Sequence, residues 1–280
     1  MREQVLVTPA ELAASQDEVV VLDVTVDLGP ARFDGDYRVA SGRGGWERRH
    51  VPGSRHVDLL TELVDPAGAH HFAHPSRAEL LAGLARLGVG DRRIVLYDEG
   101  RMQWAARAWW VLRCAGVASR VLDGGLAAWV AGGHPVEEGD AGTAPTPGAP
   151  PPVGEPYDGW ADRDEVAAVS AGERPGTLVC ALTPEQFAGT VPSRYARRGH
   201  IPGSRNLPAA SLLTPERAVR PAALADAADP LVVYCGGGIS ACLTALGLTL
   251  AGHRHVEVYD GSLEEWAADP ALPLVTSPGP

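Results

Sequence analysis

One short stretch, LVVYCGGGISACL (residues 231–243), combines a cysteine with features that could give its thiol a chemical role. An apolar run typical of a buried strand ends at Cys235, three glycines follow, and an apolar helical pattern then begins. Glycines let the main chain approach a ligand closely, and a loop that leads into a helix turns its N–H groups toward a bound anion. That anion can be a thiolate, which helix N-termini stabilise. We therefore predict Cys235 as a nucleophile. The predicted substrate-binding residues of the loop are Gly236, Gly237, Gly238, Ile239 and Ser240.

Two other interpretations of this cysteine compete with a role as nucleophile. A buried structural cysteine before a tight turn would show the same strand, glycines and helix. A cysteine phosphatase also places its cysteine before an anion-binding loop, but its transition state needs an arginine that closes the loop. The corresponding residue here is Ala241, and residues 236–253 contain no arginine. The phosphatase interpretation is therefore disfavoured.

The chain repeats itself once. Residues 93–129 align with residues 231–266, and RRHVPGSRHVDL aligns with RRGHIPGSRNLP upstream of them. The aligned pairs of the first match are Asp98 with Cys235, Asp123 with Asp260, and Trp129 with Trp266. The repeat predicts two related domains, of which only the second carries a cysteine at the end of this strand.

Within each copy, short apolar runs alternate with helical patterns, which predicts an α/β fold with a mainly parallel sheet flanked by helices. Ligands of such sheets bind beyond the carboxyl ends of the strands, where Cys235 is expected. A segment dominated by proline and glycine separates the copies. We predict an N-terminal domain over residues 1–138, a linker over 139–156 and a C-terminal domain over 157–280.

Composition limits the classes of partner. The formal net charge is −11, and all 24 cationic residues are arginines without a basic cluster typical of nucleic-acid binding. No signal-peptide pattern or apolar run long enough for a membrane span occurs. Four cysteines without a CxxC pair do not suggest a disulfide framework. We expect a reducing, cytoplasmic location, with neither nucleic acid nor membrane as partner.

With these residues in view, the chain resembles the rhodanese superfamily, in particular its two-domain sulfurtransferases of the 3-mercaptopyruvate and thiosulfate type. The matching segments span nearly the whole chain: VLDV, RRHVPGSRHVDL, WAARAWWVLR, VLDGGLAAW, GHIPGSRNLP, YCGGGISA and YDGSLEEW. The resemblance implies two tandem rhodanese-like domains, of which the first, with Asp98 in place of cysteine, is catalytically inactive.

The resemblance also implies the reaction. A sulfur atom would pass from a donor to Cys235 as a persulfide, and then to a thiol, cyanide or a thioredoxin-like protein, without a metal or organic cofactor. The neutral loop CGGGISA resembles the loop of relatives that prefer 3-mercaptopyruvate, whereas thiosulfate-preferring relatives carry basic residues there. The alternative is a non-catalytic double rhodanese module that binds sulfur or relays it to a partner protein.

Two positions depart from the family pattern. Gly237 stands where these relatives have a serine proposed to assist proton transfer, and Gln186 stands where they have an arginine that contacts the substrate carboxylate. Another cation must then bind the carboxylate. The nearest candidates in sequence are Arg194, Arg197 and Arg198.

An acid–base pair is expected from the first domain. The resemblance suggests Asp58 with a histidine of the segment HHFAH, for which we choose His71, with His70 or His74 as the alternatives. These histidines could equally be exposed loop residues without a catalytic role. A zinc site is not expected there, because no cysteine lies nearby.

Overall fold

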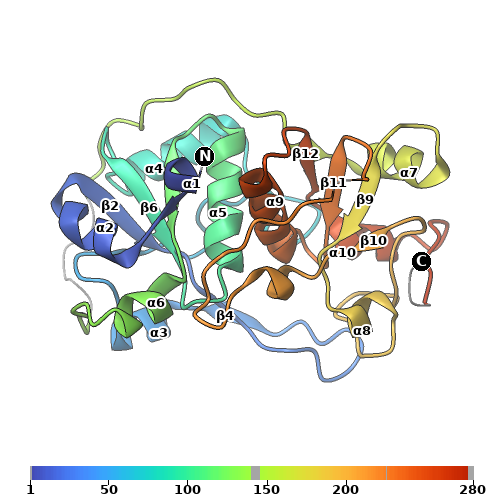
Figure 1. Ribbon diagram of the computed structural model, residues 1–280, viewed down its shortest axis with the longest axis horizontal. Coiled ribbons are helices and arrows are strands. Elements are labelled where there is room, and N and C mark those ends of the chain that lie inside the picture. Colours follow the sequence, from blue (N-terminus) through green and yellow to red (C-terminus); the bar gives the residue numbers. More distant parts are fainter. Residues whose placement is uncertain (1, 140–145, 225, 277–280) are drawn as a thin grey trace.

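The computed structural model describes residues 2–139, 146–224 and 226–276, which form two domains of the same architecture. Figure 1 shows the first domain on the left and the second on the right. Each domain contains a five-stranded sheet in which every strand pairing is parallel. The predicted α/β fold with two tandem domains is therefore confirmed.

The first sheet has the strand order β1 (Leu6–Val7), β7 (Ser119–Leu122), β6 (Arg93–Tyr97), β2 (Val19–Asp23) and β5 (Arg55–His56). The second has the order β8 (Trp160–Ala161), β12 (Val256–Tyr259), β11 (Leu231–Tyr234), β9 (Thr177–Cys180) and β10 (Arg205–Asn206). Each strand of one domain therefore has a counterpart at the same place in the other, as the sequence repeat requires.

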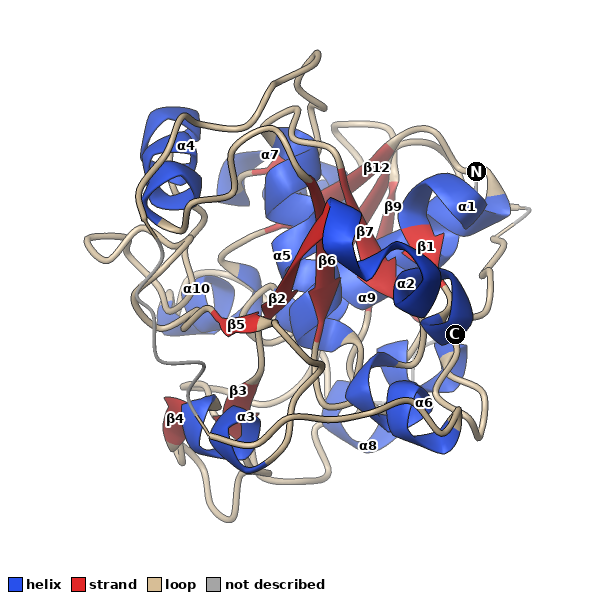
Figure 2. Ribbon diagram, turned by 90° about the vertical axis from the view of Figure 1, so that its left-hand side faces the viewer, coloured by secondary structure: helices blue, strands red, loops and turns tan. Residues whose placement is uncertain are grey.

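Helices flank both sheets (Figure 2). The first domain contains α1 (Arg2–Val5), α2 (Pro9–Ser15), η1 (Gln16–Glu18), α3 (Arg43–Arg48), α4 (Arg77–Arg86), α5 (Gln103–Cys114) and α6 (Gly125–Ala131). It also has a small antiparallel pair, β3 (Val26–Leu28) and β4 (Val39–Ser41). The second domain contains α7 (Arg163–Ala171), α8 (Pro184–Phe187), η2 (Ala209–Leu212), α9 (Ile239–Ala251) and α10 (Ser262–Ala268).

Local sequence explains where these elements begin and end. The run VVVLD forms β2 and is buried at every position, because helices cover both faces of a parallel sheet. Capping boxes fix the starts of four of the described helices, α2, α4, α7 and α8; at α4 the pair is Ser76 with Glu79. These caps satisfy N–H groups that the helices themselves leave unpaired.

Helices α5 and α9 pack against each other in the middle of the molecule (Figure 1). One apolar core runs through this contact and contains residues of both domains, among them Trp110 and Leu246. This explains why α9 is apolar on nearly all sides: it is covered by its own sheet and by the other domain. Within the described ranges, no helix combines the length and apolarity needed to cross a bilayer.

Two aspartates that align in the repeat tie the domains together. Asp123 of the first domain accepts a hydrogen bond from the backbone of Val219 in the second, at 2.8 Å. Asp260 of the second domain pairs with the buried Arg107 of the first, at 2.6 Å, and accepts a bond from the backbone of His74. The duplicated residues therefore fix the relative position of the two domains, and with it the space between them.

Part of the predicted linker, residues 140–145, lies outside the described residues. Its last residues run along the first domain, where the backbone N–H of Gly148 donates to Ala85 and that of Gly154 donates to Gly116. The isolated bridge between Val153 and Val117 belongs to the same contact. This part of the linker is therefore fixed to the first domain by its backbone.

Candidate active site

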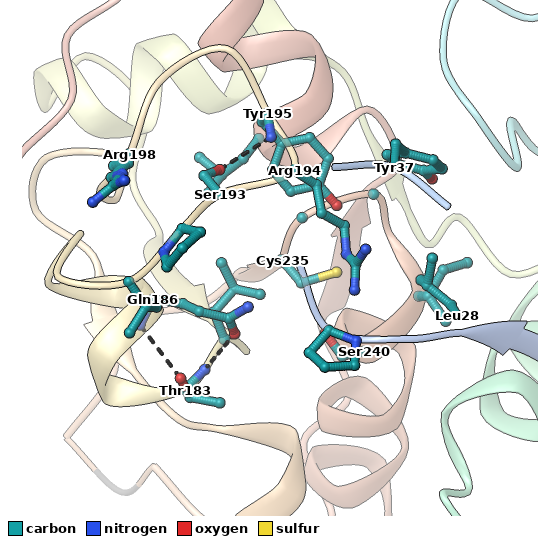
Figure 3. Close-up of a pocket in the computed structure, with 18 of the residues that line it drawn as sticks. Leu28, Tyr37, Thr183, Gln186, Ser193, Arg194, Tyr195, Arg198, Cys235 and Ser240 are labelled. Atoms are coloured by element: carbon teal, nitrogen blue, oxygen red, sulfur yellow. Dashed lines mark hydrogen bonds between the residues drawn. The ribbon is translucent and has the colours of Figure 1, made fainter. Parts of the chain in front are cut away.

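A cavity of about 410 Å³ lies between the two domains, and Cys235 forms part of its wall. Cys235 directly follows β11, at the carboxyl edge of the second sheet, and only 2% of its surface is exposed. Tyr37, Phe72 and Arg101 of the first domain line the same cavity. Figure 3 shows the sulfur of Cys235 directed into this space. A small molecule in the cavity would therefore contact both domains.

The three glycines after Cys235 differ in how strictly the structure requires glycine at each position. A Cβ atom on Gly236 would lie 2.1 Å from the hydroxyl oxygen of Tyr195, so no larger residue fits. Gly238 has φ +74°, a conformation that favours glycine, and its Cβ would lie 2.8 Å from the carbonyl oxygen of Asp260. Gly237 has neither restriction, since its closest neighbour would be a Glu264 oxygen at 3.3 Å.

A serine fixes the loop from behind. The Ser262 hydroxyl accepts hydrogen bonds from the backbone N–H groups of Cys235 and Gly238, both at 3.1 Å, and donates to the carbonyl of Tyr259. Among the described residues, further N–H groups of the loop and of the first turn of α9 have no acceptor: those of Gly236, Gly237, Ile239, Ser240, Ala241 and Cys242. This loop therefore offers a set of unpaired N–H donors next to the sulfur, which suits an anion.

Three arginines line the cavity, and they differ in their partners. Arg198 is paired with Asp34 of the first domain through two contacts, at 2.7 and 2.9 Å. Arg194 donates to the carbonyl oxygens of Asp36 and Gly29, so no carboxylate neutralises its charge within the described part of the chain. Figure 3 shows its guanidinium and the Cys235 sulfur facing the same space.

The third arginine, Arg101, comes from the first domain and has no hydrogen-bond or ion-pair partner among the described residues. No aspartate or glutamate belongs to the described lining of the cavity, although the whole chain has a formal charge of −11. The cavity is therefore locally cationic, as an anionic ligand requires.

The expectation that Arg197 binds substrate does not agree with its placement. Its guanidinium donates to four backbone carbonyl oxygens. Those of Trp266 and Ala267 lie in the last turn of α10, and those of Asp269 and Leu272 follow the helix. It is not among the residues that line the Cys235 cavity. Because the last carbonyls of a helix lack partners within the helix, Arg197 serves as their cap.

Gln186 lies in the cavity, as its place in the sequence suggests. Its side-chain oxygen accepts from the backbone N–H of Thr183 in a capping box at the start of α8 (Figure 3). Ser240 also lines the cavity from the first turn of α9. Gln186 therefore contributes a neutral amide where a family member with arginine would place a charge.

The structure does not bring Asp58 and His71 together. Asp58 accepts a hydrogen bond from the backbone of Leu60 in its own loop, at 3.0 Å. The ring of His71 stacks on Tyr37 and pairs through Nδ1 with Glu264 of the second domain, at 2.5 Å. Its side chain is 54% exposed and is not among those that line the Cys235 cavity. The partner of His71 is therefore a carboxylate of the other domain.

The two alternative histidines also have structural contacts. Nε2 of His70 lies 3.7 Å from an oxygen of Asp260, and the ring of His74 stacks on Trp160 with centroids 4.4 Å apart. Within the described ranges, no group of three His, Cys, Asp or Glu side chains is placed to hold a metal ion. The segment HHFAH thus contacts the second domain through several separate interactions.

Two tyrosines were not identified from the sequence. Burial and the nearby Cys235 raise the pKa of Tyr195 well above its ordinary value, and burial together with Glu264 raises the pKa of Tyr37. Both phenols line the cavity and keep their protons at neutral pH, so each can donate a hydrogen bond to an anion there. Neither belongs to a motif, and only the fold brings them to the loop.

Comparison with known proteins agrees with this architecture. The profile of the Rhodanese-like domain matches residues 8–132 and 189–269. A Mycobacterium tuberculosis protein named as a thiosulfate sulfurtransferase, SseB, is 36% identical over 98% of this chain and 97% of its own length. A Pseudomonas aeruginosa protein named as a 3-mercaptopyruvate sulfurtransferase is 34% identical over 97% of this chain and 98% of its own.

Solved structures show the same fold. SseA from Escherichia coli, described as a 3-mercaptopyruvate sulfotransferase, superposes with a TM-score of 0.72 and 25% identity, over 92% of this chain and 98% of its own. Tum1 from Saccharomyces cerevisiae superposes with a TM-score of 0.80 and 21% identity, over 99% of this chain and 100% of its own. The matched profile, the two relatives and the duplicated fold together show that this chain belongs to the rhodanese family.

Proposed function

We propose that the protein is a sulfurtransferase that moves sulfur from 3-mercaptopyruvate, through a persulfide on Cys235, to a thiol or cyanide. The observation that carries this proposal is the set of unpaired N–H groups beside the Cys235 sulfur, in a cationic cavity between the domains. A loop of this kind stabilises an anionic sulfur and keeps it accessible to a small molecule. The names of the most similar relatives support the same chemistry.

In the first half-reaction, the Cys235 thiolate attacks the sulfur of 3-mercaptopyruvate. The bond between that sulfur and carbon breaks, its electron pair stays with the carbon as an enolate, and protonation gives pyruvate. The sulfur remains on Cys235 as a persulfide, whose outer sulfur accepts hydrogen bonds from the loop. In the second half-reaction an acceptor removes that sulfur and restores the thiolate, which makes the reaction ping-pong.

For the donor, we favour 3-mercaptopyruvate over thiosulfate. Gly236, Gly237 and Gly238 provide no cationic side chain beside the sulfur for a dianion. Arg194, whose charge no described carboxylate neutralises, is our candidate for the carboxylate of mercaptopyruvate. Steady-state measurement of kcat/KM with both donors checks this preference, and a larger value with thiosulfate would reverse it.

Mass spectrometry tests the intermediate directly. Incubation with 3-mercaptopyruvate should add about 32 Da, one sulfur atom, to the peptide that contains Cys235. Cys235→Ser should abolish this gain, whereas Cys114→Ser and Cys180→Ser, which alter buried thiols outside the cavity, should keep it. A persulfide at another cysteine would contradict the assignment of the nucleophile.

The second candidate function is a module that binds sulfur or relays it to a partner without turnover. The neutral Gln186 at the place of a substrate-binding arginine is the observation that favours it. Turnover of 3-mercaptopyruvate with a small thiol separates the two, since a pure binding module would show none. The cytoplasmic location and a thioredoxin-like acceptor stay predictions.

A further inference from the structure

A second cavity, of about 400 Å³, adjoins the Cys235 cavity. Six residues line both: Arg101, Gln103, Leu182, Thr183, Gln186 and Ser240. The two cavities therefore adjoin at the start of α9, with these six side chains between them and the Cys235 sulfur in the first. A donor as small as 3-mercaptopyruvate would occupy only the part around Cys235 and would leave the second cavity open.

The charges of the second cavity point to the kind of molecule that it holds. Arg101 from the first domain and Arg217 from the second line it, and no aspartate or glutamate belongs to its described lining. Neither guanidinium has a hydrogen-bond or ion-pair partner within residues 2–139, 146–224 and 226–276, in contrast to Arg198 with its Asp34. Two unneutralised cations from different domains thus face one space, which favours a carboxylate-bearing ligand.

Arg217 is held in place by its own turn and by the other domain. The backbone N–H of Thr214 donates to Ala218 and that of Arg217 donates to Thr214, both at 2.9 Å. Arg217 has φ +69°, a strained conformation for a residue with a side chain. Two residues further along, the backbone N–H of Val219 donates a hydrogen bond to the Asp123 carboxylate of the first domain, at 2.8 Å. The turn that carries Arg217 is therefore anchored by its backbone at the domain boundary.

We propose that this second cavity, here called the acceptor cavity, binds a small thiol that carries at least one carboxylate. Arg101 and Arg217 bind the carboxylate, and the thiol reaches the Cys235 sulfur past the side chains that line both cavities. The inference rests on the proposed function, because it assumes a persulfide on Cys235, and it adds the chemical class of the acceptor.

The transfer balances without a further reactant. The acceptor thiolate attacks the outer sulfur of the Cys235 persulfide and forms a new sulfur–sulfur bond. The bond between the outer sulfur and Sγ of Cys235 breaks, and its electron pair returns to Sγ as a thiolate. The acceptor leaves as its own persulfide, and the sulfur atom moves without net oxidation or reduction.

Single-turnover kinetics test this subsite apart from the donor reaction. The enzyme is loaded with a sulfur donor, freed of donor, and checked for one added sulfur on Cys235. It is then mixed with mercaptosuccinate, which carries two carboxylates, or with the uncharged 2-mercaptoethanol, and loss of the persulfide is followed by mass spectrometry. Arg217→Ala should slow discharge by mercaptosuccinate about 5- to 10-fold and change discharge by 2-mercaptoethanol less than about twofold.

Arg220→Ala is the matched control, since Arg220 is also exposed, lies three residues further along and does not line the cavity. It should leave both thiols unaffected, and raising the salt concentration should shrink the effect of Arg217→Ala. Equal changes for the two thiols, or no change for either, would overturn the acceptor cavity and leave the sulfurtransferase proposal intact. Failure of the unmodified protein to take up sulfur would overturn both.

Discussion

The loops after β6 and β11 occupy the same place in the two domains, yet one fills its anion site with its own side chain and the other leaves it open. In the first domain, the Asp98 carboxylate accepts hydrogen bonds from the backbone N–H groups of Gly100, Met102, Trp104 and Ala105, at 2.8–3.2 Å. In the second, Cys235 provides only a sulfur atom, and the N–H groups of Gly237, Ile239, Ala241 and Cys242, which align with these four, have no acceptor in the described structure. The same backbone conformation therefore binds its own carboxylate in one copy and leaves its N–H groups open in the other.

A second difference between the two domains accompanies that between Asp98 and Cys235. Gly125 of the first domain aligns with Ser262 of the second, and both have positive φ, +59° and +48°. A Cβ on Gly125 would lie 2.3 Å from the carbonyl oxygen of Asp98, so the first loop excludes a serine. In the second domain, the Ser262 hydroxyl accepts hydrogen bonds from the backbone N–H groups of Cys235 and Gly238, to which no carboxylate is bonded. The serine therefore holds the second loop in place while its remaining N–H groups stay open.

The largest expected effect comes from making the second loop like the first. Cys235→Asp removes the nucleophile and places a carboxylate beside the open N–H groups, so turnover should fall by more than about 10³-fold with either donor. The converse change, Asp98→Cys, should give no sulfur uptake at position 98, because Asp98 is not among the described lining of the cavity that Arg194 and Tyr195 share with Cys235. Turnover assays and peptide mass spectrometry check both, and a persulfide at position 98 would show that the loop alone suffices.

Removal of the carboxylate in the first loop should affect stability. Asp98→Ala leaves four buried N–H groups without their acceptor and should lower the free energy of unfolding by about 3–4 kcal/mol. Asp98→Asn, which keeps one acceptor oxygen, should cost about 1–2 kcal/mol. Urea denaturation measures both values. If Asp98→Ala were as stable as the unchanged protein, the carboxylate would not be what holds the first loop.

The glycines of the second loop should not be equivalent. Gly236→Ala places a methyl group against the Tyr195 hydroxyl and should displace the loop, lowering kcat/KM by about 10²-fold. Gly237→Ala, whose methyl group meets its closest neighbour at 3.3 Å, should change kcat/KM by less than about threefold. Equal losses in the two variants would mean that loop flexibility, not the contact with Tyr195, decides the requirement for glycine.

Ser262→Ala tests the support of the open loop. Two buried N–H groups lose their acceptor, so the free energy of unfolding should fall by about 1–2 kcal/mol, less than for Asp98→Ala. Ser211→Ala, an exposed serine whose hydroxyl bonds only within its own turn, should stay within about 0.5 kcal/mol of the unchanged protein. A loss for Ser262→Ala no larger than this control would mean that the hydroxyl contributes nothing to the loop.

The smallest expected effect is that of His71→Gln. His71 is exposed and paired with Glu264 outside the cavity, so turnover should change by less than about threefold, far below the roughly 10²–10⁴-fold loss of a missing general acid. Assays with both donors measure it. A large loss restricted to 3-mercaptopyruvate would restore the acid role that the sequence suggested.

The sequence alone determined the duplication, the parallel α/β architecture and the place of Cys235 at a strand end. Those features follow from apolar periodicity, from glycine and from aligned residues, which are local properties of the chain. The same local signals explain the capping boxes of α4, α7 and α8. They hold because a buried strand or a helix start needs particular residue types at fixed spacings.

Only the tertiary structure decided which side chains surround the sulfur. Arg194 and Arg197 lie three residues apart, yet one lines the cavity and the other caps α10. Tyr37 and Arg101 come from the first domain and reach the site only because α5 packs on α9. Spacing along the chain carries no information on such contacts, since they depend on how two domains are oriented, and that is set by a shared core and by the buried pair of Arg107 with Asp260.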